Sequence, residues 1–133
     1  MSYWMDTQFS SSRDQEKSPA SMLFGPQFMS LNLYQLCSAE DLTLGMTLVR
    51  VGSLFLEDLS SAPPFSKGHY GSVDVVYIIC CQDLAITENF QRWMIENNPV
   101  KEVKVIEEAD HMAMLSRPKE LCKYLSEVVN TYV

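Results

Sequence analysis

An aspartate and a histidine, each placed after an apolar run, are the residues best suited to chemistry in this chain. Asp83 follows Val73–Cys81, and His111 follows Val103–Ile106. A carboxylate beside an imidazole holds the ring in one tautomer and stabilises the imidazolium once the ring takes a proton. The two residues are 28 positions apart. That interval accommodates one helix and one strand, which would bring the chain back to the neighbouring loop.

Each residue alone has an ordinary structural interpretation, Asp83 as a turn aspartate and His111 as a loop or partly buried histidine. Together they match the acid and base of a Ser…Asp…His triad, in the chain order used by α/β-hydrolases. That order places the nucleophilic serine earlier, in a Gly-x-Ser-x-Gly turn, and no serine of this chain has that setting. The sequence therefore predicts an acid–base pair without its nucleophile.

One further segment resembles a nucleophile turn. Gly68-His69-Tyr70-Gly71 has the flanking glycines, with tyrosine in place of serine. It precedes an apolar run, whereas a nucleophile turn follows a strand. We therefore interpret it as a polar loop.

The elements that must position the pair are two strands and two helices. Val73–Cys81 is almost continuously apolar, which is typical of a parallel strand buried on both faces. Lys101–Ile106 alternates enough to predict a second strand. Thr87 is suited to cap a helix between them, and Pro118 to open the last helix. The predicted order from residue 67 to residue 133 is β-α-β-α, the C-terminal part of an α/β-hydrolase core.

Residues 1–66 predict an all-helical layer that forms a cap, and the two parts together make one truncated domain. Gly25-Pro26 is expected to begin one helix, and Ser38-Ala39-Glu40-Asp41 is a capping-box pattern that begins another. Ser10–Ser21 is polar and is expected to be a loop. Methionine and aromatic side chains are frequent in this layer. Core packing explains them most simply, and the lining of an apolar pocket is the alternative.

Composition excludes several classes of function. Ten Lys and Arg against seventeen Asp and Glu give a net charge of -7, which argues against binding nucleic acid or an anionic membrane. The N-terminus lacks the pattern of a signal peptide. The four scattered cysteines are expected to be free thiols in the cytoplasm, and two histidines far apart in the sequence do not predict a metal site.

The chain closely resembles the plant methylesterase family of α/β-hydrolases. Six segments carry the resemblance: Trp4–Phe9, Phe24–Pro26, Leu33–Ser38, Ser53–Leu59, Phe90–Ile95 and Asp110–Leu115. The resemblance covers the whole chain but only the C-terminal half of the family's length. It implies a partial α/β-hydrolase fold, in which a helical cap is followed by the last two parallel strands and helices.

The resemblance also implies roles for single residues. Asp83 and His111 match the family's catalytic acid and base. Five others match positions that line the apolar substrate pocket: Trp4, Phe9, Met22, Leu54 and Met112. Hydroxynitrile lyases of this family carry a lysine directly after the histidine, so Met112 places the chain nearer the esterases. Those esterases cleave methyl esters of salicylate, jasmonate and indole-3-acetate, and they use no cofactor.

The expected function is that of an inactive methylesterase without nucleophile or oxyanion hole. Two alternatives are a half-enzyme completed by an N-terminal half in trans, and a non-catalytic module that binds a small aromatic acid. The expected ligand is thus a hormone methyl ester or its acid. An unpaired strand edge also predicts self-association and marginal stability.

Overall fold

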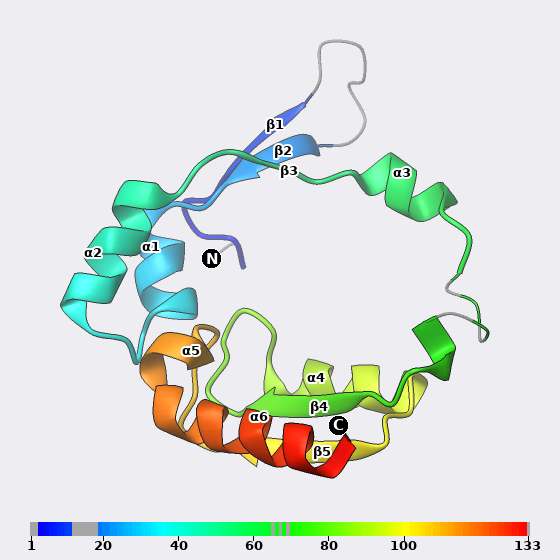
Figure 1. Cartoon of the computed structure of the whole chain (residues 1–133). Helices are drawn as coiled ribbons and strands as arrows, with labels where there is room; N and C mark the ends of the chain where they lie inside the picture. The colour runs from blue at the N-terminus through cyan, green and yellow to red at the C-terminus, as the bar shows by residue number, and fades with distance from the viewer. Residues whose placement is uncertain (1–2, 12–18, 65, 67, 69, 133) are drawn as a thin grey trace.

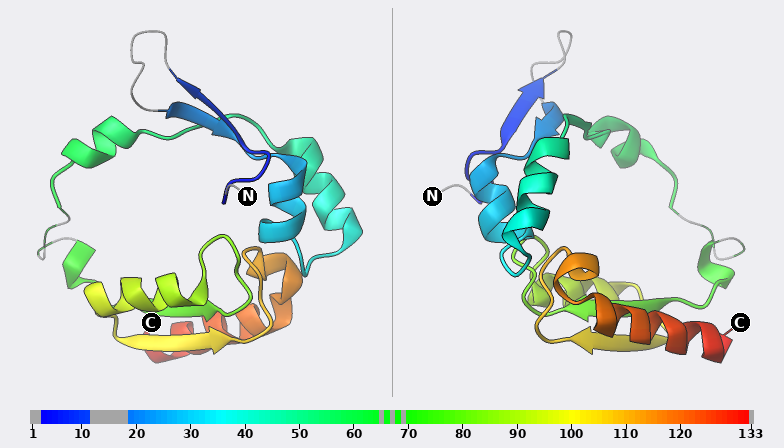
Figure 2. Two further views of the ribbon diagram at one scale, coloured as in Figure 1. Left: turned by 180° about the vertical axis from the view of Figure 1, so that it is seen from behind. Right: turned by 60° about the vertical axis from the view of Figure 1, so that its left-hand side comes forward.

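The chain follows an open ring in the computed structural model, which describes residues 3–11, 19–64, 66, 68 and 70–132. A cap region forms one arc of the ring, and a layer of two strands and their helices forms the other (Figure 1). The two arcs meet where helices α1 and α2 of the cap lie near α5. On the far side, helix α3 and a short 3₁₀ turn carry the connection, as Figure 2 shows from behind.

The arc that holds the parallel strands follows the predicted β-α-β-α order, with one short additional helix, α5, that was not predicted. Its elements are β4 (Val76–Cys80), α4 (Glu88–Asn97), β5 (Glu102–Ile106), α5 (Ala113–Ser116) and α6 (Pro118–Tyr132). The two strands are parallel, with Cys80 opposite Ile106. Helix α4 covers one face of the pair and α6 the other (Figures 1 and 2). The predicted parallel pair and the start of the last helix at Pro118 are both confirmed.

The core of this layer is small. Ile79 and Ile106 are fully buried. Ile106 packs with Ala109 and Ala113, and α6 covers this cluster with Leu121 and Tyr124. The helix places these side chains on one face, because its apolar residues recur at helical spacing.

The prediction that Val73–Cys81 is one strand buried on both faces is only partly right. The strand begins at Val76, and Val73 is 64% exposed. Within β4 only Ile79 is buried. Among the described residues β4 pairs with β5 alone, so one of its edges is open. Apolar composition indicated a strand correctly, but it cannot indicate how many neighbours cover that strand.

The cap mixes strands with helices. Its elements are β1 (Gln8–Ser11), β2 (Pro19–Leu23), α1 (Pro26–Phe28), the π-helical turn η1 (Met29–Leu33), α2 (Ala39–Leu48), β3 (Gly52–Ser53) and α3 (Leu56–Ser61). The strands form an antiparallel sheet in the order β1-β2-β3. The prediction of an all-helical layer is therefore wrong. These strands are short and rich in serine, so backbone pairing forms them without a hydrophobic signal in the sequence.

Two other predictions concern loops. Ser10–Ser21, predicted as a loop, contains the end of β1 and the start of β2, and residues 12–18 lie outside the described residues. His69, and residue 67 where the second part was predicted to begin, also lie outside them. Tyr70–Ser72 form the 3₁₀ turn η2.

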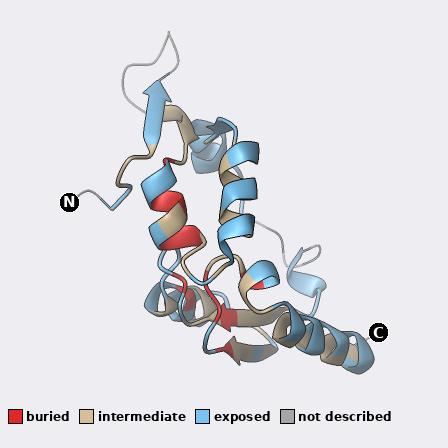
Figure 3. Ribbon diagram, turned by 90° about the vertical axis from the view of Figure 1, so that its left-hand side faces the viewer, coloured by how far each residue is buried: buried red, intermediate tan, exposed pale blue. Residues whose placement is uncertain are grey.

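The predicted helix starts have different physical causes. Pro26 occupies the first turn of α1, as expected. Ser38 caps α2, since its Oγ accepts a hydrogen bond from the Asp41 N–H at 3.1 Å. Thr87 stands at the cap position of α4, but its side chain makes no capping bond. The cap's own core is Phe28, Met29 and Leu33, visible as the buried part of α1 and η1 in Figure 3.

We expect Ile106→Ala to lower the free energy of unfolding by about 2–5 kcal/mol, because it leaves a cavity between β5 and α6. Val103→Ala on the same strand is the matched control. Val103 is 41% exposed, so its loss should cost about 1 kcal/mol or less. Urea titration followed by circular dichroism measures both. Equal losses would show that the core does not lie where the structure places it.

Candidate active site

The acid of the predicted pair sits in a turn that directly follows β4. Asp83 is 6% exposed. Its Oδ1 accepts hydrogen bonds from the backbone N–H groups of Ala85 and Ile86, each at 2.8 Å. A carboxylate that bonds its own turn in this way is held rigidly. The other oxygen, Oδ2, is left to face the histidine.

Asp83 and His111 lie side by side, as predicted. The Asp83 Oδ2 to His111 Nδ1 distance is 2.9 Å. An ionised carboxylate only accepts hydrogen bonds, so the hydrogen belongs to Nδ1. The neutral ring then has its lone pair on Nε2. The His111 side chain is 33% exposed, so a reactant can reach it.

The aspartate also tunes the base. The hydrogen bond to Asp83 raises the pKa of His111 above its usual value. Burial of the ring lowers that pKa, and the charges of Asp83 and Asp110 raise it further. A base of this kind accepts a proton more readily than a free imidazole.

A second buried carboxylate, Asp110, stands next to the histidine. Asp110 is fully buried. Its Oδ2 accepts from the Leu36 N–H at 2.9 Å, and its Oδ1 accepts from the Met112 N–H at 3.0 Å. The Cys37 Sγ lies 3.4 Å from Oδ2. Burial, with the nearby Asp110 charge, raises the pKa of the Cys37 thiol to about 12, which keeps it a protonated donor.

Helix α4 holds the acid turn through a buried glutamine. Gln91 is 3% exposed. Its Oε1 accepts from the Cys80 N–H at 3.0 Å, and its Nε2 donates to the carbonyls of Cys80 and Ile86 at 2.9 and 2.7 Å. The helix thus turns a polar side chain inward. Phe90 and Trp93 stack on each other on its exposed surface instead.

Sequence reasoning did not assign a site role to Asp110 or Gln91. Asp110 is buried whereas Glu108, two residues earlier, is exposed, and this difference depends on what the fold places against each side chain. Gln91 lies between Phe90 and Arg92 in a predicted helix, and glutamine is mostly exposed in proteins, so the residue type did not indicate burial. The sequence indicated a site role only through position. Asp110 directly precedes His111, and Gln91 is in the helix that follows the Asp83 turn.

The cap is fastened to the acid turn by side chains. Three of them donate to backbone carbonyls of the turn: Gln35 to Gln82 at 2.6 Å, Asn32 to Leu84 at 3.4 Å, and Tyr3 to Ala85. Ala85 also packs on the cap's core. The acid and the cap therefore have a fixed relative position.

Three of the five predicted pocket residues form one group. The rings of Trp4 and Phe9 meet edge-on at 5.6 Å. Met22 lies directly opposite Phe9 across β1 and β2, hence on the same face of the sheet. Leu54 follows β3, and its N–H bonds the Ala20 carbonyl of β2 at 2.9 Å. Met112 belongs to the base loop, where its N–H donates to Asp110.

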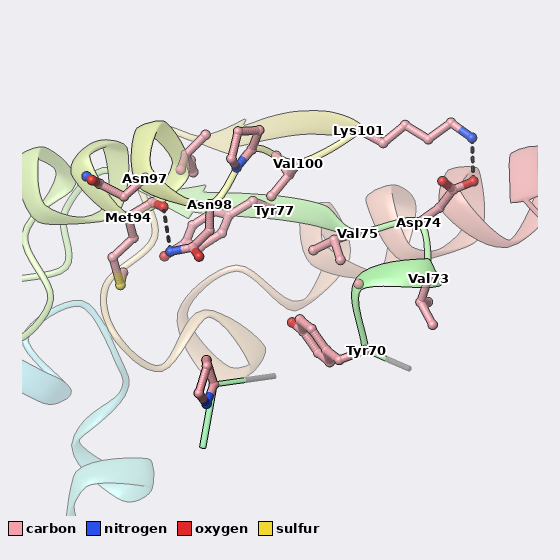
Figure 4. A pocket seen from close by; sticks show the side chains of 14 residues that line it. Tyr70, Val73, Asp74, Val75, Tyr77, Met94, Asn97, Asn98, Val100 and Lys101 are labelled. Carbon is pink, nitrogen blue, oxygen red and sulfur yellow. Dashed lines mark hydrogen bonds and ion pairs between the residues drawn. The ribbon is translucent and has the colours of Figure 1, made fainter. Parts of the chain in front are cut away.

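A hollow of about 1080 Å³ lies at the opposite end of the strand pair (Figure 4). It lies between the start of β4 and the end of α4, and Tyr70, Tyr77 and Met94 are among its lining. None of the five predicted pocket residues lines it. It is therefore separate from the Asp83–His111 pair, which stands where the two strands end.

In the described part of the chain, no group of three His, Cys, Asp or Glu side chains is placed to hold a metal ion. No helix in that part is both long and apolar enough to cross a membrane.

The chain has clear relatives among known proteins. Salicylic acid-binding protein 2 of Nicotiana tabacum is 51% identical over 129 residues, which are 97% of this chain and 50% of the relative. Methyl jasmonate esterase 1 of Vitis vinifera is 47% identical over 96% of this chain and 49% of its own length.

The chain belongs to the plant methylesterase family. The crystal structure of polyneuridine aldehyde esterase, another member, superposes with a TM-score of 0.88 at 46% identity, over 96% of this chain and 50% of that one. This methylesterase-family chain thus spans about half the length of the relatives it matches. A scan against models of protein families matches none. The partial α/β-hydrolase fold predicted from the sequence is confirmed.

We expect Asp83→Asn to lower the pKa of His111, because it removes both the hydrogen bond and the charge that raise it. NMR titration of the imidazole C–H signals measures this, with His69→Gln to assign the two histidines. Asp74→Asn is the matched control, since Asp74 is exposed and paired with Lys101. An unchanged His111 pKa in Asp83→Asn would contradict the geometry.

The same bond makes stability depend on pH. Its stabilisation is complete below the unfolded pKa of about 6.5, and it is lost as pH rises through the raised folded pKa. The free energy of unfolding of the unmodified chain should therefore fall as pH rises from about 6.5 through the raised pKa of His111. That of Asp83→Asn should not show this fall.

Proposed function

We propose that this chain carries the acid–base pair and the acyl-binding cap of a plant methylesterase. The substrates are methyl esters of small acids such as salicylate, jasmonate and indole-3-acetate. The observation that carries the proposal is the Nδ1–Oδ2 bond of 2.9 Å between His111 and a nearly buried Asp83. It leaves Nε2 free to act as a base.

The base would act on a serine that these 133 residues do not contain in the required turn. His111 Nε2 takes the serine proton while the serine oxygen bonds the ester carbonyl carbon. The tetrahedral intermediate then expels the methoxy group, which leaves as methanol with the proton from His111. Water repeats the sequence, and it releases the acid and frees the serine.

Without that serine, His111 has no nucleophile to activate. The oxyanion donors of this fold also lie near the nucleophile turn and an earlier loop, and they supply the largest electrostatic stabilisation of the transition state. We therefore propose that the 133 residues are inactive alone and that a complementary half restores activity.

Three features support methyl esters of small acids as the substrates. One relative is named for binding salicylic acid and another as a methyl jasmonate esterase. Met112 follows His111 at the position where the hydroxynitrile lyases of the family have a lysine, which favours an esterase. Trp4 and Phe9 supply aromatic surface of the kind that holds a planar ring.

We expect the purified chain to leave methyl salicylate intact, and to hydrolyse it when mixed with the half of salicylic acid-binding protein 2 that it does not match. In the mixture His111→Ala should abolish turnover. His69→Ala is the matched control and should retain it. If the chain alone hydrolyses the ester and His111→Ala removes that activity, the proposal that the chain is inactive alone is wrong. If two folded halves are mixed and no hydrolysis is seen, the proposal of complementation is wrong.

The cap's binding role has its own test. The chain has two tryptophans, whose indole N–H signals Trp93→Phe distinguishes in a ¹H–¹⁵N NMR spectrum. Titrated salicylate should move the Trp4 signal to saturation and leave Trp93 unmoved, because Trp93 lies exposed on α4. Equal shifts of both signals, or none up to millimolar ligand, would contradict the assignment of Trp4 to the acyl pocket.

A further inference from the structure

The fully buried Asp110 carboxylate is not needed for the proton transfer just described, yet burying it requires a reason. A buried charge is costly unless its oxygens are hydrogen-bonded. Both of its oxygens are used. Oδ1 accepts from the Met112 N–H at 3.0 Å and Oδ2 from the Leu36 N–H at 2.9 Å.

The first of these bonds closes a turn around the base. Asp110 and Met112 are the residues on either side of His111. A side-chain oxygen that binds the N–H two residues later fixes the intervening backbone. The Cα position of His111 is thereby set by Asp110, while its ring direction is set by Asp83.

The second bond reaches the cap, 74 residues earlier in the chain. Leu36 and Cys37 lie between η1 and α2, next to Gln35, which bonds the acid turn. The Cys37 thiol lies 3.4 Å from the same oxygen. One carboxylate thus joins the base loop to the cap segment that leads out of η1.

We propose that Asp110 is a positioning residue that clamps the His111 loop to the cap, so that the base is correctly placed only when the cap is docked. This inference rests on the proposed methylesterase function for its catalytic consequence. The clamp itself belongs to this chain and is testable without activity.

The test is Asp110→Asn, which keeps the size of the side chain but turns one of its two acceptors into a donor. In the complemented enzyme we expect kcat to fall about tenfold or more, since small displacements of a catalytic group are costly. KM should change less than about threefold, because Met112 is the one predicted pocket residue with a hydrogen bond to Asp110 among the described residues, and only its backbone N–H makes that bond. Glu108→Gln is the matched control, since it also removes a carboxylate from this loop. Glu108 is exposed and is paired with Arg117. An unchanged kcat per folded enzyme in Asp110→Asn, with only a lower melting temperature, would overturn the proposal.

Hydrogen exchange on the chain alone separates this inference from the proposed function. In unmodified chain the Leu36 and Met112 amides should exchange about tenfold or more slowly than unprotected loop amides. Asp110→Asn should speed exchange at Leu36 or Met112, and Glu108→Gln should not. Fast exchange of both amides in unmodified chain overturns the clamp, even if Asp110→Asn fails to fold. If both amides exchange slowly but the mixture of the two halves has no esterase activity, the proposed function is wrong and the clamp still stands.

Discussion

The parallel pairing of β4 with β5 is the constraint on which the rest of the site depends. Cys80 lies opposite Ile106, so both strands end at the same edge of the sheet. The chain stays paired past that edge, since the Cys81 N–H bonds the Ile106 carbonyl at 3.1 Å and the Gln82 N–H bonds the Ala109 carbonyl at 3.0 Å. These bonds bring the two following loops together before any side chain acts. A shift of register by one residue would separate Asp83 from His111.

Buried polar side chains convert this proximity into fixed geometry. Asp83, Gln91 and Asp110 are each nearly or fully buried and bonded to backbone groups. Because an unsatisfied buried polar group costs free energy, each one penalises conformations in which its partners move away. The acid turn, the base loop, helix α4 and the cap are therefore held as one unit. The apolar clusters around Phe28 and Ile106 stabilise the fold, but apolar contacts are not directional and do not fix the orientation of the site residues.

The sequence predicted the part of the fold that strong local signals define. An apolar run rich in β-branched residues indicated β4, Pro118 indicated the start of α6, and Ser38 indicated the start of α2. Each of these effects is local, because it depends on the residue itself and its neighbours in the sequence. The pairing of Asp83 with His111 followed from the order of strands and helices. The β1-β2-β3 sheet was not predicted, because pairing between short serine-rich segments depends on distant backbone partners. Asp110 and Gln91 were not identified as site residues, because burial of a polar side chain is decided by the tertiary contacts around it.

Asp83 holds the hydrogen of His111 on Nδ1 and so leaves Nε2 as the free base. Ring-nitrogen NMR of ¹⁵N-histidine-labelled chain, recorded above the pKa of His111, tests this most directly. We expect a protonated Nδ1 and an unprotonated Nε2. A ring with its hydrogen on Nε2, or a rapidly exchanging mixture like that of free imidazole, would contradict it.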